Sequence, residues 1–131
     1  MKLLLDTHIW LWGLVDPERL VSRVKRALVS PENEIWLSPI SVWEALVLAE
    51  KGRLSLEGDA QAWVVRALDR MPVREAPISF DIASESRRLS LSHDDPADRF
   101  LAATARVLEL TLVTADRRLL KAKGLAVLPN D

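Results

Sequence analysis

The chain opens with Met1-Lys2-Leu3-Leu4-Leu5-Asp6-Thr7, a short apolar run that stops at an acid. The residues from Lys2 to Leu5 are typical of a buried strand. Two more short apolar runs, Ile35-Trp36-Leu37 and Thr111-Leu112-Val113, have the same character. Helical patterns lie between these runs. This alternation favours an α/β fold with a largely parallel sheet that is covered on both faces.

The remaining segments fit the same plan of strands separated by helices. Ser38-Pro39 starts a helix that ends near Lys51-Gly52, because proline is tolerated in a first turn and glycine suits a helix end. Asp95-Pro96 starts another helix. We also expect helices around 7–16, 20–28, 60–71, 82–89 and 116–124, with strands at 73–76 and 125–128. The 131 residues show no repeat or linker, so we expect one domain over residues 1–131.

Composition indicates a globular protein and excludes several kinds of site. Apolar residues make up 49% and charged residues 28%, and the net charge is −1. The absence of cysteine excludes disulfides and thiolate metal sites, and it suits a cytoplasmic location. No apolar run is long enough for a membrane helix, and the first residues do not resemble a signal peptide. A general polyanion binder is usually more basic, so contact with nucleic acid would be local or aided by a metal.

Four acids fall at positions that a parallel sheet brings together. Asp6 directly follows the first strand, and Asp116 lies just beyond Thr111-Leu112-Val113. Glu44 lies inside the helix that starts at Ser38-Pro39, and Asp98 lies in the first turn after Asp95-Pro96. Ligand sites in such sheets form beyond the carboxyl ends of the strands. We therefore predict that the four acids converge on one cleft.

Carboxylates that converge repel one another unless protons or a cation neutralise them. Hard oxygen ligands without histidine or cysteine favour Mg²⁺ or Mn²⁺. Such an ion suits phosphodiester hydrolysis, because it lowers the pKa of water and stabilises charge on a departing oxygen. The pattern predicts a metal-dependent site of this kind.

Each acid also has a purely structural interpretation. Asp6, Asp95 and Asp116 stand where an aspartate caps a helix, and Asp98 suits the dipole of a first turn. Ser41-Val42-Trp43-Glu44 matches a capping box. Glu44 fits this interpretation least, because a helix that begins at Pro39 places it too deep to cap.

The motifs together resemble PIN-domain ribonucleases, in particular the VapC-type toxins of VapBC toxin–antitoxin pairs. The resemblance covers essentially the whole chain, and its matching pieces are Leu4-Leu5-Asp6-Thr7-His8 with Trp12, Ser38 with Ser41-Val42-Trp43-Glu44, Lys51-Gly52-Arg53-Leu54, His93 before Asp95-Pro96-Ala97-Asp98-Arg99, and Leu112-Val113-Thr114-Ala115-Asp116. Two residues depart from the pattern of the family. Ala97 replaces the usual aromatic after Asp-Pro, and Asp94 adds an acid beside Asp95.

The resemblance implies a three-layer α/β/α fold around a central, mainly parallel sheet. It implies Mg²⁺ or Mn²⁺ held by Asp6 and Asp98, with Glu44 and Asp116 in the other two acidic positions. It also implies endonucleolytic cleavage of RNA, a homodimer and inhibition by a cognate antitoxin. All four acids are therefore catalytic and metal-ligand candidates.

Other polar residues have supporting interpretations. Thr7 and Thr114 are expected to bind carboxylates or the scissile phosphate, or to act as local caps. Arg99 is expected to pair with a neighbouring acid. His93 is a loop-shaping residue by the resemblance, and a general base is the alternative. The basic residues from 117 to 123 either grip phosphates or form a solvated helix face.

The tryptophans leave several interpretations open. Trp36 and Trp63 follow core patterns. Trp10, Trp12 and Trp43 belong to the core, to a dimer interface or to a groove for the antitoxin. Base stacking is a further interpretation of these aromatic side chains.

Three other functions remain as alternatives. A catalytically inactive PIN-like binding module would keep the fold without the chemistry. A receiver-type phosphoacceptor domain needs paired acids after the first strand and a central Asp, which the sequence does not supply. An aspartate-nucleophile phosphatase needs a second Asp two residues after Asp6, where His8 stands.

Overall fold

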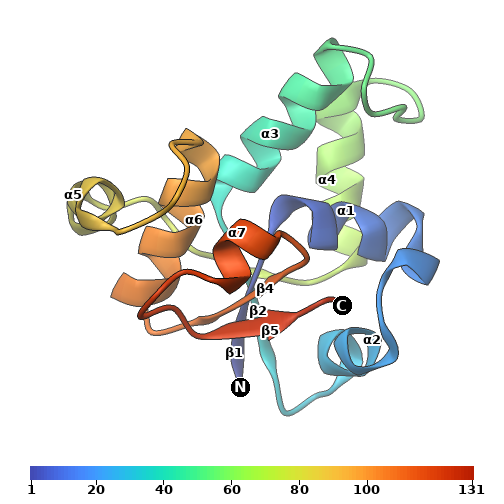
Figure 1. The fold of residues 1–131 in the computed structure, drawn as a ribbon. Helices are drawn as coiled ribbons and strands as arrows, with labels where there is room; N and C mark the ends of the chain where they lie inside the picture. The colour runs from blue at the N-terminus through green and yellow to red at the C-terminus, as the bar shows by residue number, and fades with distance from the viewer.

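The computed structural model describes residues 1–131 and alternates strands with helices along the chain. Its strands are β1 (Lys2–Leu5), β2 (Glu34–Leu37), β3 (Arg74–Glu75), β4 (Thr111–Thr114) and β5 (Val127–Pro129). Its helices are α1 (Thr7–Val15), η1 (Pro17–Arg19), α2 (Ser22–Val29), α3 (Pro39–Glu50), α4 (Ala60–Arg70), α5 (Phe80–Arg88), α6 (Pro96–Val107) and α7 (Arg117–Leu120). The predicted α/β alternation is confirmed (Figure 1).

All five strands are parallel and follow the order β3-β2-β1-β4-β5. The chain therefore builds outward from β1 to β3 on one side, then crosses over to place β4 and β5 on the other. In the register of the central pair, Leu5 stands beside Val113. The order of the strands reverses between β1 and β4, and the carboxyl ends of strands at such a point form a crevice.

The sheet separates two hydrophobic cores, which makes the three-layer arrangement. Successive side chains of a strand point to opposite faces. Leu3 and Leu5 join the core beneath α1, α2 and α4, whereas Leu4 joins the core beneath α5, α6 and α7. Figure 1 shows α5 and α6 on one side of the sheet and α1, α2 and α4 on the other. α3 contacts α1, α4 and α6, so it bridges the two layers above the strand ends.

The predicted helix starts are confirmed at the two Pro-initiated helices. The Ser38 side chain accepts a hydrogen bond from the backbone of Ile40, and Asp95 does the same for Asp98. The outer strands are shorter or later than predicted. β3 covers only 74–75, and β5 covers 127–129 rather than 125–128, because each edge strand pairs with its single neighbour over those residues alone.

None of the helices combines the length and the apolar character that a membrane crossing would require.

Candidate metal centre at the carboxyl ends of the strands

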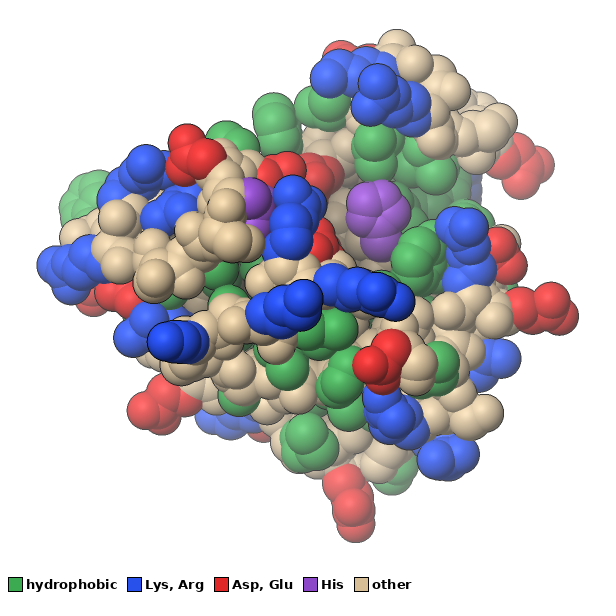
Figure 2. All heavy atoms as spheres, viewed as in Figure 1, with side chains coloured by type: hydrophobic (Ala, Val, Ile, Leu, Met, Phe, Trp, Pro, Cys, Tyr) green, Lys and Arg blue, Asp and Glu red, His purple; other side chains and the backbone are tan.

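The four predicted acids line one pocket at the carboxyl ends of β1 and β4. Its volume is about 340 Å³, and it is lined by Asp6, His8, Trp12, Glu44, Asp95, Asp98, Ala115, Asp116 and Arg118. Asp6 directly follows β1, and Asp116 lies two residues past β4, the neighbouring strand. α3 supplies Glu44, and the first turn of α6 supplies Asp98. Figure 2 shows acidic side chains set between basic and histidine side chains on this face.

Asp6 is the deepest acid of the pocket. It stands at the N-cap position of α1 but makes no side-chain cap, so the capping interpretation is wrong for this residue. Its Oδ2 instead accepts a hydrogen bond of 2.7 Å from the Thr114 hydroxyl. Burial raises the pKa of Asp6 from 3.8 to about 6, against the lowering effect of Thr114. A buried carboxylate of this kind gains from a nearby cation.

Glu44 projects from the second turn of α3 and is held by a hydroxyl. Because the helix begins at Pro39 with Ser38 as its cap, Glu44 caps nothing. The Thr7 hydroxyl, fully buried, donates to Glu44 Oε1 at 2.5 Å and lies 2.9 Å from the Ser41 hydroxyl. Burial raises the pKa of Glu44, and Thr7 opposes that rise.

Asp98 is held by a histidine from the preceding loop. His93 Nε2 lies 2.8 Å from Asp98 Oδ2. Burial raises the pKa of Asp98, while the His93 contact lowers it. The structure thus brings His93 directly against an acid of the site, and Asp95 caps α6 beside it through the Asp98 backbone.

Asp116 differs from the other three acids because it is paired with a cation. It caps α7 by accepting from the Arg118 backbone at 2.8 Å, as its structural interpretation predicts. The Arg118 guanidinium also donates to both of its carboxylate oxygens, at 3.3 Å and 3.0 Å. The hydrogen bond from Arg118 lowers the pKa of Asp116, so this acid stays ionised.

A single hydroxyl links the two acids at the strand ends. Thr114 donates to Asp6 and accepts from the Asp116 backbone at 3.0 Å. Thr7 and Thr114 therefore both bind within the acidic cluster, each from the end of a core element. Neither caps a helix with its side chain.

Arg99 makes the expected ion pair with a neighbouring acid, Asp94, but its closer contacts are with backbone carbonyls. The residue is only 8% exposed, and its side chain donates to the backbone carbonyls of Ser86, Leu89 and His93. The nearest acid is Asp94, at 3.9 Å, so the expected pairing is secondary. Arg99 holds the loop that carries His93 and does not enter the pocket.

The donor set of the pocket fits a divalent cation. Hydrogen bonds engage one carboxylate oxygen each of Asp6, Glu44 and Asp98, which leaves the second oxygen of each free to accept or ligate. His93, Asp98 and Asp116 also offer ligand atoms within 4.8 Å of one another. Oxygen-rich sites of this kind suit Mg²⁺ or Mn²⁺.

Sequence reasoning missed some residues that line the pocket. The sequence does not single out Arg118 among the basic residues from 117 to 123, and it leaves Trp12 open between the core, a dimer interface and an antitoxin groove. His8 is part of the Leu4–His8 motif, where a histidine invites a general-base role. Trp12 lines the pocket beside His8, with ring centroids 5.8 Å apart. The sequence also left the roles of Trp10 and Trp43 undecided. Trp10 is fully buried and belongs to the core, whereas Trp43 is 56% exposed and lies at the surface.

Comparison with known proteins gives concordant matches. The model of the PIN domain matches residues 3–125. Ribonuclease VapC22 of Mycobacterium tuberculosis is 34% identical over 117 residues, which covers 88% of this chain and 88% of that protein. The structure of FitAcB from Neisseria gonorrhoeae matches with a TM-score of 0.68 at 25% identity, covering 98% of this chain and 97% of that one. VapBC2 from Rickettsia felis, bound to a DNA fragment from their promoter, has the same fold, with a TM-score of 0.76 at 19% identity and full coverage of both chains.

Proposed function

The chain belongs to the PIN domain family, and from that premise we propose that it is a metal-dependent endoribonuclease, the toxin of a toxin–antitoxin pair. The observation that carries the proposal is the convergence of Asp6, Glu44, Asp98 and Asp116 on one pocket. Three of these acids keep a free oxygen. The 34% identity to a ribonuclease over most of the chain supports the same reaction class.

The acids hold an ion and position the reacting groups. Asp6 and Asp98 are the principal ligands, and Glu44 and Asp116 complete the site. When bound, Mg²⁺ or Mn²⁺ neutralises the carboxylates and stabilises the charge that develops on phosphate oxygens. The hydroxyls of Thr7 and Thr114 orient Glu44 and Asp6 through hydrogen bonds. The contact with His93 orients Asp98.

A carboxylate with a raised pKa is suited to accept a proton from water. Glu44 is half-buried at the wall of the pocket, and burial raises its pKa. We assign to Glu44 the orientation of the attacking water and the acceptance of its proton, because a general base works best with a pKa near the working pH. The in-line attack forms a bond from the water oxygen to phosphorus and breaks the bond between phosphorus and the leaving oxygen of the RNA, which takes a proton from solvent.

The experiment is an RNA cleavage assay with Mg²⁺ or Mn²⁺, with EDTA, and with Asp6→Asn. We expect EDTA to abolish cleavage and Asp6→Asn to reduce it by at least about a hundredfold. Losing a group that only supports a metal ligand costs up to about a hundredfold, and losing the ligand itself should cost at least as much. Asp69→Asn, an exposed acid of α4, is the matched control and should cleave like the wild type. Cleavage that survives EDTA or Asp6→Asn would contradict the metal-carboxylate mechanism.

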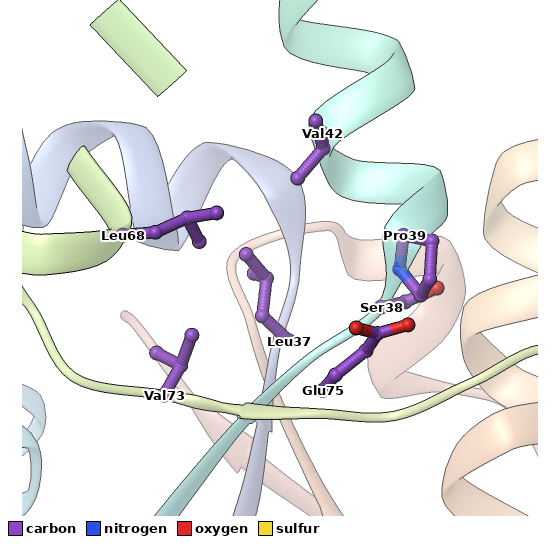
Figure 3. A pocket seen from close by; sticks show the side chains of 7 residues that line it. All are labelled: Leu37, Ser38, Pro39, Val42, Leu68, Val73 and Glu75. Atoms are coloured by element: carbon purple, nitrogen blue, oxygen red, sulfur yellow. The ribbon is translucent and has the colours of Figure 1, made fainter. Parts of the chain in front are cut away.

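We further propose that the antitoxin covers an apolar hollow beside the N-terminus of α3. The hollow has a volume of about 330 Å³ and is lined by Leu37, Ser38, Pro39, Val42, Leu68, Val73 and Glu75 (Figure 3). In Figure 3 the side chains of Val42 and Leu68 face each other across it from α3 and α4. A hollow between two helices suits the apolar face of a partner helix. Glu75 at its rim suits a basic residue of that partner.

The partner proposal is tested by co-purification with the protein encoded by the adjacent reading frame. Leu68→Asp places a charge in the hollow and should abolish the complex. Val65→Asp is the matched control, because Val65 is 69% exposed on the same helix and does not line the hollow. Equal retention of the partner by both variants would place the contact elsewhere. Light scattering on the same samples tests the homodimer that we expect for this family.

A further inference from the structure

Arg118 lines the acidic pocket although its helix, α7, is the shortest α-helix of the chain. α7 is a turn of four residues, and Arg118 follows its cap residue by two positions. The side chain folds back, so that Nη2 lies 3.0 Å from Asp116 Oδ2 and 3.7 Å from Asp98 Oδ2. The guanidinium therefore contacts two of the four acids on which the proposed ion depends.

The contacts of Arg118 occupy both carboxylate oxygens of Asp116 and leave Oδ1 of Asp98 free. Both oxygens of Asp116 accept hydrogen bonds from the Arg118 side chain, and the shared oxygen of Asp98 also faces His93. No other acid of the pocket has both carboxylate oxygens engaged in this way. A cation and a guanidinium cannot occupy the same carboxylate oxygens at full strength, because both seek the same negative charge.

Nothing else in the structure restrains the guanidinium. Its side chain is 53% exposed, and its only hydrogen-bond acceptors are the two oxygens of Asp116. The flexible stem leaves the head group free to turn outward while its Cα stays at the rim. A planar guanidinium released there matches the geometry of a phosphate, which it binds through paired donors.

We propose that Arg118 is a positioning residue that exchanges partners: it neutralises Asp116 and Asp98 in the metal-free protein, and it moves to a phosphate of the RNA when the divalent ion takes those carboxylates. The inference rests on the proposed metal-dependent function and adds a role for a residue outside the four acids. It makes Arg118 a competitor of the ion and a ligand of the substrate.

The two roles predict effects of opposite sign for one substitution. Arg118→Ala removes the competitor, so the Kd for Mn²⁺ in the absence of RNA should tighten by roughly two- to fivefold, the range for a half-exposed ion pair. The same variant loses a phosphate contact, so a fluorescent 2′-O-methyl oligonucleotide of random sequence should bind more weakly in saturating Mg²⁺. General damage to the site would weaken both affinities, so the opposite signs identify the exchange.

Two further variants separate the exchange from a simple change of charge. Arg117→Ala removes the same charge from the adjacent residue, which does not line the pocket, and should alter the Mn²⁺ affinity less than Arg118→Ala. Arg118→Lys keeps the positive charge but loses the paired donors of the guanidinium. Its affinities for Mn²⁺ and for the oligonucleotide should therefore lie between those of the wild type and of Arg118→Ala.

Calorimetric titration of Mn²⁺ and fluorescence anisotropy of the oligonucleotide give the two affinities directly. Tightening of Mn²⁺ binding together with weakening of oligonucleotide binding supports the exchange. Any other pair of signs for Arg118→Ala, or an equal effect of Arg117→Ala on Mn²⁺, would overturn it. Failure of the wild type to bind Mn²⁺, or undiminished binding by Asp6→Asn, would instead overturn the proposed function itself.

Discussion

Replacing Asp6 with Asn is expected to stabilise the metal-free protein while it removes metal binding. Asp6 is 7% exposed, and burial raises its pKa from 3.8 to about 6. The folded protein therefore holds a proton on Asp6 more tightly than the unfolded chain does. Ionisation of this group opposes folding at neutral pH, and an uncharged amide of the same shape avoids that opposition.

The magnitude follows from the two pKa values. At about 1.4 kcal/mol for each pKa unit between 3.8 and about 6, the ionised Asp6 lowers the free energy of unfolding by about 3 kcal/mol. The sign is that of a raised pKa: stability is greatest below the unfolded value and falls as the pH rises through the folded value. The stability difference between Asp6→Asn and the wild type should therefore grow from about pH 4 to about pH 6 and then level off.

The assay is urea unfolding in EDTA, followed by tryptophan fluorescence across this pH range. The chain has five tryptophans, and Trp10 is fully buried in the core beneath α1, so the change in their combined emission reports the loss of core packing. Asp116→Asn is the matched control, because Arg118 lowers the pKa of Asp116 and its replacement should reduce stability at neutral pH. The reasoning is refuted if Asp6→Asn is no more stable than the wild type at neutral pH. It is also refuted if Mg²⁺ stabilises Asp6→Asn as much as it stabilises the wild type.

Three further predictions concern the groups that support the acids. Thr7→Val removes the hydroxyl that donates to Glu44 and should weaken Mn²⁺ binding about 10- to 100-fold by calorimetry, with recovery in Thr7→Ser. Normal Mn²⁺ binding by Thr7→Val would contradict this role of the hydroxyl. His93→Ala removes a contact that lowers the pKa of Asp98, so the pH at which Mn²⁺ binding is half-maximal should rise; an unchanged or lower midpoint would argue against this role. Arg99→Met leaves buried carbonyls without a donor and should lower the free energy of unfolding by about 2–4 kcal/mol in urea, and stability equal to the wild type would show that the loop does not depend on it.

The part of the site that depends on strand ends can be predicted from sequence. An acid directly after a buried run, such as Asp6 after β1, reaches the carboxyl edge whatever the order of the strands. Asp116 after β4 follows the same rule, and a Pro-initiated helix gives the depth of Glu44 and the first-turn position of Asp98. These placements use short-range signals, namely periodicity, proline and helix starts.

The contacts that complete the site depend on the tertiary fold and could not be predicted in this way. Arg118 enters the pocket because its guanidinium folds back onto Asp116, the cap residue of α7, and the sequence offers other basic residues close by. His93 reaches Asp98 because Arg99 holds the preceding loop through its carbonyls. Arg99 itself looks like a surface ion-pairing residue in sequence, since nothing local reveals that backbone acceptors surround it.

The arrangement of the acids links the stability of the metal-free fold to ion binding. Burial raises the pKa of Asp6, Glu44 and Asp98, so ionising them together disfavours the folded state without a cation. An ion that binds only the folded state stabilises it, by about 2.7 kcal/mol when its concentration is a hundred times its Kd. That gain is close to the roughly 3 kcal/mol by which ionised Asp6 alone opposes folding. Ion binding should therefore flatten the fall of stability with pH in the wild type, and a fall that Mg²⁺ leaves equally steep would show that the ion does not meet these carboxylates.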